Sequence, residues 1–185
     1  MRLVFLLLIS FLPAYSQLFS VGVKAGVPLT SAFNDATLSH FDDRYVIGPT
    51  AEIHFLFHLS LEADALYRRN GFGVTALQNN YVTVGIFSVN DWQVPVLGKY
   101  QLPGVPMVHP FVDAGPVYRH VSRNNSYPPA NANSGGFAIG GGVNLKFLFL
   151  RISPEIRYTH WGQTAFNLLT TSTNNQADFL VGFTF

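Results

Sequence analysis

The sequence contains no cysteine, which excludes disulfide bonds, thiolate metal sites and a lipidated N-terminal cysteine. Charged residues are also scarce, at 11% of the 185 residues, whereas soluble domains carry roughly 25%. Lys and Arg together number 11 and Asp and Glu 10, so no basic excess is present to hold nucleic acid. Hydrophobic residues reach 48% and aromatic residues 15%. The length fits one domain, and its composition is unusually apolar.

Long hydrophobic runs are missing as well, except for one at the N-terminus. Arg2 is followed by an apolar stretch at residues 3–12, and Ala14-Tyr15-Ser16 has the small-x-small form of a cleavage site. This pattern predicts a secretory signal peptide at 1–16, because a membrane-spanning helix needs about 20 apolar residues. The domain is then expected at 17–185, with no transmembrane helix in it.

The rest of the chain alternates between apolar segments with a period of two residues and polar stretches rich in Gly, Asn, Ser and Pro. This alternation is typical of β-strands separated by turns and loops. It predicts strands at 18–27, 45–56, 58–68, 92–102, 108–119, 137–147, 149–160 and 177–185. The connections are alternately long and short, as in an antiparallel meander. We therefore predict an all-β, eight-stranded, antiparallel up-and-down barrel.

Charged side chains within the predicted strands share one face of each strand. They are Lys24, Glu52, Glu62, Asp64, Arg68, Lys99, Asp113, Arg119, Lys146, Arg151, Glu155, Arg157 and Asp178. The opposite face carries no charge and is apolar throughout. A soluble β-domain would bury this apolar face, whereas a transmembrane barrel would turn it towards lipid.

Aromatic residues favour the transmembrane barrel over the soluble domain. Five of them lie on the apolar face at the long-loop ends of their strands, namely Tyr45, Tyr67, Trp92, Tyr118 and Tyr158. Such a girdle marks a membrane interface, and a soluble domain leaves it unexplained.

The charged face would then fill the lumen, since eight strands leave room only for side chains. We predict a salt-bridged plug of Lys24, Glu52, Glu62, Lys99 and Asp178, with Lys24 meeting Asp178 where the last strand closes on the first. The wider lumen charge network includes Asp64, Asp113, Glu155 and Arg157. A stabilising polar core is the first interpretation, and a small ion path is the alternative.

Five prolines fall inside predicted strands, although a closed barrel has no edge on which to place them. They are Pro49, Pro95, Pro110, Pro116 and Pro154. We expect some of them at bulges or strand ends near a rim.

Several stretches resemble the outer-membrane protein β-barrel domain family, the small eight-stranded type. The matching stretches are "VGVKAGVPL", "LSLEADALYRRNGFG", "NDWQVPVLGKYQL" and "HPFVDAGPVYRH", together with the final Phe. The resemblance covers about residues 18–185 and implies an outer-membrane location. It also implies that Phe179, Val181, Phe183 and Phe185 form the C-terminal signal read by the barrel-assembly machinery. It brings no single activity.

The candidate catalytic residues of the sequence are a serine, a glutamate and a histidine on one predicted strand. Ser153 and Glu155 are predicted to point inwards and His160 outwards, so these three do not converge as a lipid-modifying triad requires. His54, His58 and His109 are expected as ordinary polar residues near one rim. We predict no catalytic, cofactor or metal site.

The long connections are where binding would occur on this scaffold. Val82, Val84 and Ile86 keep the outward parity of the strand at 92–102, so this strand is expected to begin near residue 81 and project as a hairpin beyond the membrane. The sequence predicts a monomeric outer-membrane wall protein with a filled lumen, lipid as its surroundings and a possible extracellular ligand. A small pore and a lipid-modifying enzyme are the alternatives.

Overall fold

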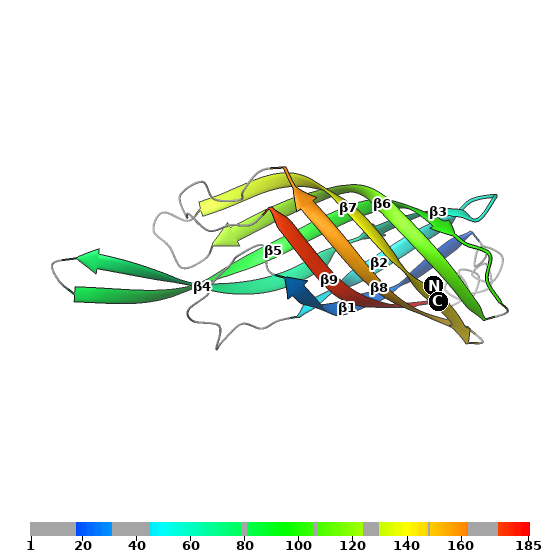
Figure 1. Ribbon diagram of the computed structural model, residues 1–185, viewed down its shortest axis with the longest axis horizontal. Coiled ribbons are helices and arrows are strands. Elements are labelled where there is room, and N and C mark those ends of the chain that lie inside the picture. The colour runs from blue at the N-terminus through cyan, green and yellow to red at the C-terminus, as the bar shows by residue number, and fades with distance from the viewer. Residues whose placement is uncertain are drawn as a thin grey trace, which may run out of the picture.

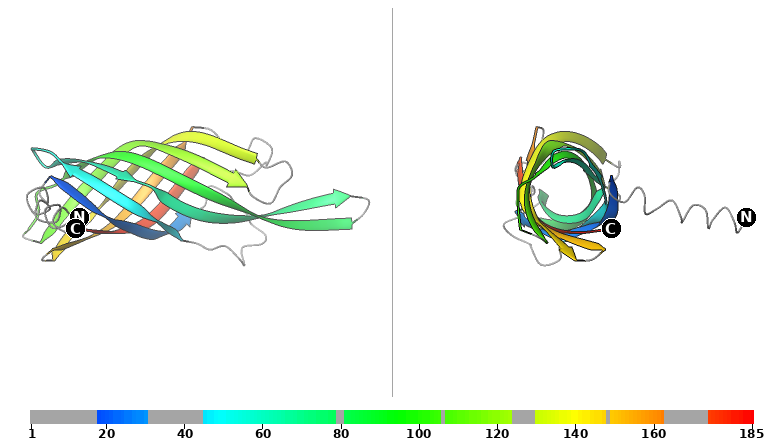
Figure 2. Two further views of the ribbon diagram at one scale, coloured as in Figure 1. Left: turned by 180° about the vertical axis from the view of Figure 1, so that it is seen from behind. Right: turned by 90° about the vertical axis from the view of Figure 1, so that its right-hand side faces the viewer.

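The computed structural model describes residues 18–30, 45–78, 81–105, 107–123, 130–147, 149–162 and 174–185. The strands are β1 (Phe19–Thr30), β2 (Val46–His54), β3 (Leu59–Asp64), β4 (Leu66–Gln78), β5 (Tyr81–Gln101), β6 (Val108–Arg123), β7 (Ala130–Phe147), β8 (Leu150–Trp161) and β9 (Asn175–Thr184). All are paired antiparallel, and β1 pairs with both β2 and β9, which closes the sheet (Figure 1). The view along the axis shows a ring of strands (Figure 2).

Strands β3 and β4 form one strand of the wall, interrupted at Ala65. Both pair with β2 on one side and with β5 on the other. The barrel therefore has eight strands, and the predicted all-β fold class is confirmed. Among the described residues, no helix is long and apolar enough to cross a membrane.

Proline explains the interruption. The described strands show no bulge at the five prolines, whereas Pro110 lies near a strand end as expected, two residues after the start of β6. The Ala65 amide donates to the Pro49 carbonyl at 3.0 Å, but Pro49 has no N–H to return to the ladder. Pro95 and Pro154 likewise lie beside gaps in the ladder, with the same register on both sides of each gap. Among the described strands, the one register shift lies between Pro28 and Thr30. A missing hydrogen bond is thus tolerated in these strands without a change of register.

The two faces of the wall differ in the way the sequence predicts. Val21, Ile139, Ile156 and Phe183 are among the many large apolar residues exposed on the outside. Lys24, Glu62 and Arg157 are at most 3% exposed, inside the barrel. Polar side chains therefore fill the interior, and a small apolar cluster accompanies them, made of Leu97, Val117, Ala138 and Trp161. This is the inverse of a soluble barrel.

Several strands are longer than predicted, above all at one end. Strand β5 begins at Tyr81, where we expected it, and β4 runs alongside it to Gln78. Together they form a hairpin that projects far beyond the rest of the barrel (Figure 1). We call this the hairpin end. The opposite end, which holds the C-terminus, the turn near 55–58 and Phe149, is the short-turn end.

Candidate functional site: the charged lumen

Glu62 on β3 is the centre of the charges inside the barrel. Its carboxylate accepts hydrogen bonds from Lys24 on β1 and Lys99 on β5, and from Arg157 on β8, whose Nη2 lies 3.0 Å from Oε1. These four side chains are each 2–3% exposed. Strands on opposite sides of the ring are thereby connected through the middle of the lumen.

Arg157 and Lys24 extend this central cluster to two further carboxylates. The Arg157 guanidinium donates to Asp64 at 2.8 Å and to Glu155 at 2.6 Å. The Lys24 ammonium donates to Glu155 at 3.0 Å and lies 3.3 Å from Asp64. Isolated buried charges are very costly, but each charge here has partners of opposite sign.

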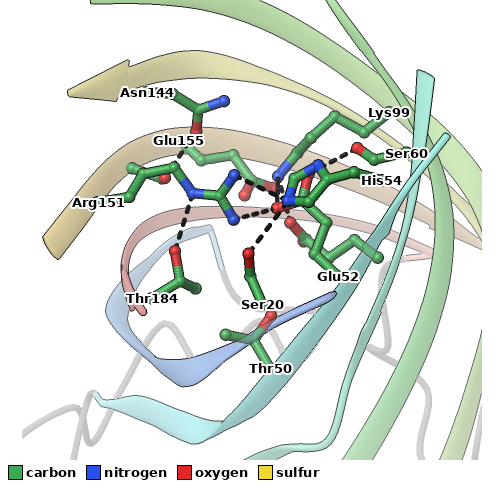
Figure 3. A network of polar contacts seen from close by, with 12 residues as sticks. Ser20, Thr50, Glu52, His54, Ser60, Lys99, Asn144, Arg151, Glu155 and Thr184 are labelled. Carbon is green, nitrogen blue, oxygen red and sulfur yellow. Dashed lines mark hydrogen bonds and ion pairs between the residues drawn. The ribbon is translucent and has the colours of Figure 1, made fainter. Parts of the chain in front are cut away.

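A second cluster lies nearer the short-turn end and is drawn in Figure 3. Glu52 accepts from the Arg151 Nη2 atom at 2.5 Å and from the Ser60 hydroxyl at 2.6 Å. Lys99 lies 3.7 Å from Glu52 and thus connects this cluster to Glu62. The two clusters form one continuous network along the lumen.

A third group of polar residues lies nearer the hairpin end. Arg119 makes two hydrogen bonds to Asp91, at 3.0 and 2.7 Å, and its guanidinium stacks over the Trp161 ring at 5.0 Å. Arg68 donates to Asp178 at 2.7 Å. The bidentate contact of Arg119 with Asp91 depends on the planar fork of a guanidinium, which lysine does not have.

Asp113 is the exception among the predicted lumen residues. It is 2% exposed, but neither carboxylate oxygen has a hydrogen-bond partner among the described residues. One of its oxygens lies within 4.8 Å of one oxygen of Glu62 and one of Glu155. Three carboxylates could in principle hold a metal ion, but Lys24 and Arg157 already bind two of them and would repel a cation.

Glycine in β7 makes room for these side chains. A Cβ atom on Gly140 would lie 2.5 Å from the Asp113 Oδ1 atom, and one on Gly142 would lie 2.8 Å from the Phe111 ring. The glycine run at 140–142 therefore lets the wall approach inner side chains, as a strand glycine commonly does.

Two expectations about individual charges were wrong. Lys24 does not meet Asp178, which pairs with Arg68 instead, because β1 and β9 are staggered so that Lys24 lies opposite Gly182 and Pro28 opposite Asp178. Lys146 is exposed at the short-turn end rather than enclosed in the lumen.

Asp91 and Trp161 are lumen residues that the sequence prediction missed, since both were assigned to connections. They are 0% and 1% exposed. A signal for Asp91 was present: it shares the inward parity of Gln93 and Lys99, and the alternation of this strand continues before residue 92.

The predicted aromatic girdle residues lie on the outer surface. Tyr45, Trp92, Tyr118 and Tyr158 are exposed and Tyr67 is partly exposed. Tyr67 and Trp92 are a cross-strand pair, with ring centroids 5.2 Å apart. Phe179, Phe183 and Phe185 are also exposed on the outside, and Val181 is partly exposed.

The candidate lipid-modifying residues do not converge. Ser153 and Glu155 are buried in the lumen, where the Ser153 hydroxyl donates to Asn144 at 2.7 Å. His160 is exposed on the outer surface and contacts Asn175 at 2.9 Å. A nucleophile and its base must lie within hydrogen-bond distance of each other, and this set does not.

Comparisons with known proteins define the class of fold. Neisserial surface protein A (NspA) superimposes with a TM-score of 0.64 at 12% identity, covering 90% of this chain and 94% of that one. Outer membrane protein OprG from Pseudomonas aeruginosa gives 0.55 at 14%, covering 90% and 95%. Ail of Yersinia pestis, in complex with the heparin analogue sucrose octasulfate, gives 0.52 at 10%, covering 91% and 97%.

The fold is therefore that of the small eight-stranded outer-membrane β-barrels, as the resemblance of the sequence implied. No protein-family model matches the chain, and no curated protein matches it significantly.

Proposed function

We propose that this protein is an integral outer-membrane wall protein with a closed lumen, exported by the signal peptide at 1–16, whose role is structural and surface-facing. The single observation that supports this best is the network around Glu62. Its ion pairs join β1, β3, β5 and β8 across the interior, so an ion moving along the axis would have to break buried contacts.

Planar-bilayer recording of the pure protein tests the closed lumen. We expect no steady single-channel steps, because opening a path past Glu62 leaves buried charges unpaired, at a cost of about 3–5 kcal/mol. Large and steady steps would instead favour the small pore.

The surface-facing part of the proposal rests on the β4–β5 hairpin. Residues 70–89 contain no charged residue and no proline, although exposed strand edges are usually protected by one or the other. Among the residues that the structure describes, the pairing of β5 with β6 ends at Val89 and Arg123 on the hairpin side. We infer that the hairpin contacts a partner surface that is itself uncharged. Such a partner differs from the highly sulfated ligand in the structure of the Ail complex.

Cysteine labelling tests the orientation, since the chain has no cysteine of its own. Gln78→Cys at the hairpin end is expected to react with a membrane-impermeant maleimide on intact cells. Leu56→Cys, which is 79% exposed at the short-turn end, is the matched control and is expected to react only after the outer membrane is opened. Labelling of Leu56→Cys alone on intact cells would reverse the proposed orientation.

A further inference from the structure

The short-turn end of the lumen opens into a cavity of about 490 Å³, lined by residues from both halves of the barrel. Ser20, His54, Lys146 and Arg151 contribute its polar side, and Phe55 and Phe149 contribute apolar surface. The volume is within the range of small-molecule sites, roughly 300–1,000 Å³. A mixed polar and apolar lining is typical of such sites.

Two of the side chains that line this cavity are cations, and the lining also includes Phe185, the last residue of the chain, which carries the α-carboxylate. Lys146 and Arg151 are these cations, and no carboxylate side chain is among the lining residues. Glu52 is not among the lining residues, and its carboxylate is held by Arg151, Ser60 and Lys99.

The Arg151 side chain is held by hydrogen bonds, whereas the Lys146 side chain can contact a ligand. The Arg151 Nε atom donates to the Thr184 hydroxyl at 2.9 Å and Nη1 lies 3.3 Å from the His54 ring (Figure 3). The Lys146 ammonium is exposed and forms no ion pair with any described residue. A free cation above a rigid polar floor can receive an anionic group.

The apolar residues at the rim indicate what such an anion carries. Phe149 and Phe55 are 78% and 57% exposed and line the same cavity as Lys146. A carboxylate on an aromatic or aliphatic body would place its charge at Lys146 and its body against these rings.

We propose that this cavity is a binding site for a small organic carboxylate, entered from the short-turn side of the barrel. Lys146 supplies the charge contact, the hydroxyl groups of Ser20 and Thr184 supply hydrogen bonds, and Phe149 supplies apolar contact. The site ends at the Glu52–Arg151 pair, so binding requires no passage through the lumen.

Benzoate and benzamide are matched probes, because they have nearly the same shape and only benzoate is charged. Titration of the folded protein in detergent, followed by backbone amide NMR, is expected to show saturable shifts near Lys146 and Thr184 with benzoate. Benzamide is expected to bind at least about tenfold more weakly, since it lacks the charge. Inorganic phosphate as a competitor distinguishes recognition of a simple anion from recognition of the whole carboxylate.

Lys146→Gln should weaken benzoate binding about tenfold, and Arg69→Gln, which removes an exposed charge near the hairpin end, should leave it unchanged. Equal binding of benzoate and benzamide would overturn the proposal, as would equal loss in both variants or the absence of saturable shifts. If phosphate bound as tightly as benzoate, the apolar contact with Phe149 would contribute nothing, and its proposed role would be overturned.

Discussion

Glu62 shows at the scale of single residues how a polar lumen can stabilise a barrel. It accepts from three cationic side chains while being 3% exposed. Glu62→Gln would remove one carboxylate partner from each of these cations, but Lys24 and Arg157 keep Asp64 and Glu155, and Lys99 keeps Glu52. The cost should therefore lie at the lower end of the about 3–5 kcal/mol for removing one partner of a buried pair. We expect the free energy of unfolding in urea, measured in detergent micelles, to fall by that amount.

Asp113→Asn is the matched control, because it removes the same charge from the same region. The Asp113 oxygens have no hydrogen-bond partner among the described residues and lie near two other carboxylates, so Asn there should leave stability unchanged or raise it. An equal loss of stability in both variants would show that Glu62 is not the centre of the network.

Sequence parity predicted which side chains face inwards, but not which of them pair. Glu52, Glu62 and Lys99 could be placed together from their distances to the short turns, and the structure joins them. The partners of Lys24 and Asp178 could not be predicted. Long side chains reach across the lumen, and the stagger of β1 against β9 is set by closure of the whole ring.

At the scale of elements, the hairpin was only half predicted. Val82, Val84 and Ile86 gave a clear alternation, so the start of β5 could be placed near residue 81. The sequence predicts a hairpin here but gives no bounds for its other strand, which contains Asn70, Gly71 and Gly73, residues of low β-propensity. Pairing with β5 along its whole length overrides that propensity.

Excision of the hairpin tests whether it is separate from the barrel. Replacing residues 71–88 by Asn-Gly joins the register pair Asn70 and Val89 through a two-residue turn. We expect heat-modifiable migration on gels to persist and the free energy of unfolding to change by less than about 1 kcal/mol.

A deeper excision provides the contrast. Joining Leu66 to Gln93, which are also a register pair, removes Arg68 and Asp91 and so breaks two buried ion pairs. This variant should lose folded protein. Loss of folding already with the shorter excision would mean that the hairpin is part of the barrel wall.

At the scale of the whole molecule, the closed wall and the central charge cluster both depend on the pairing of β1 with β9. It leaves no open edge in the wall, and it encloses Lys24, which contributes to the central cluster from the first strand. Residues far apart in the sequence, such as Glu62 and Arg157, can meet only because the ring is closed.

A cysteine pair across this seam tests closure directly. Ala25 and Val181 are opposite each other in the register of β1 and β9, and the chain has no other cysteine. Ala25→Cys with Val181→Cys should form an intramolecular disulfide in the folded protein and raise its free energy of unfolding by about 2–4 kcal/mol. Ala25→Cys with Ile139→Cys, on the non-adjacent β7, should form none. Lys24 reaches the central cluster from β1, which pairs with β9. If the Ala25→Cys and Val181→Cys variant formed no disulfide, both the closed wall and the central ion pairs would be contradicted.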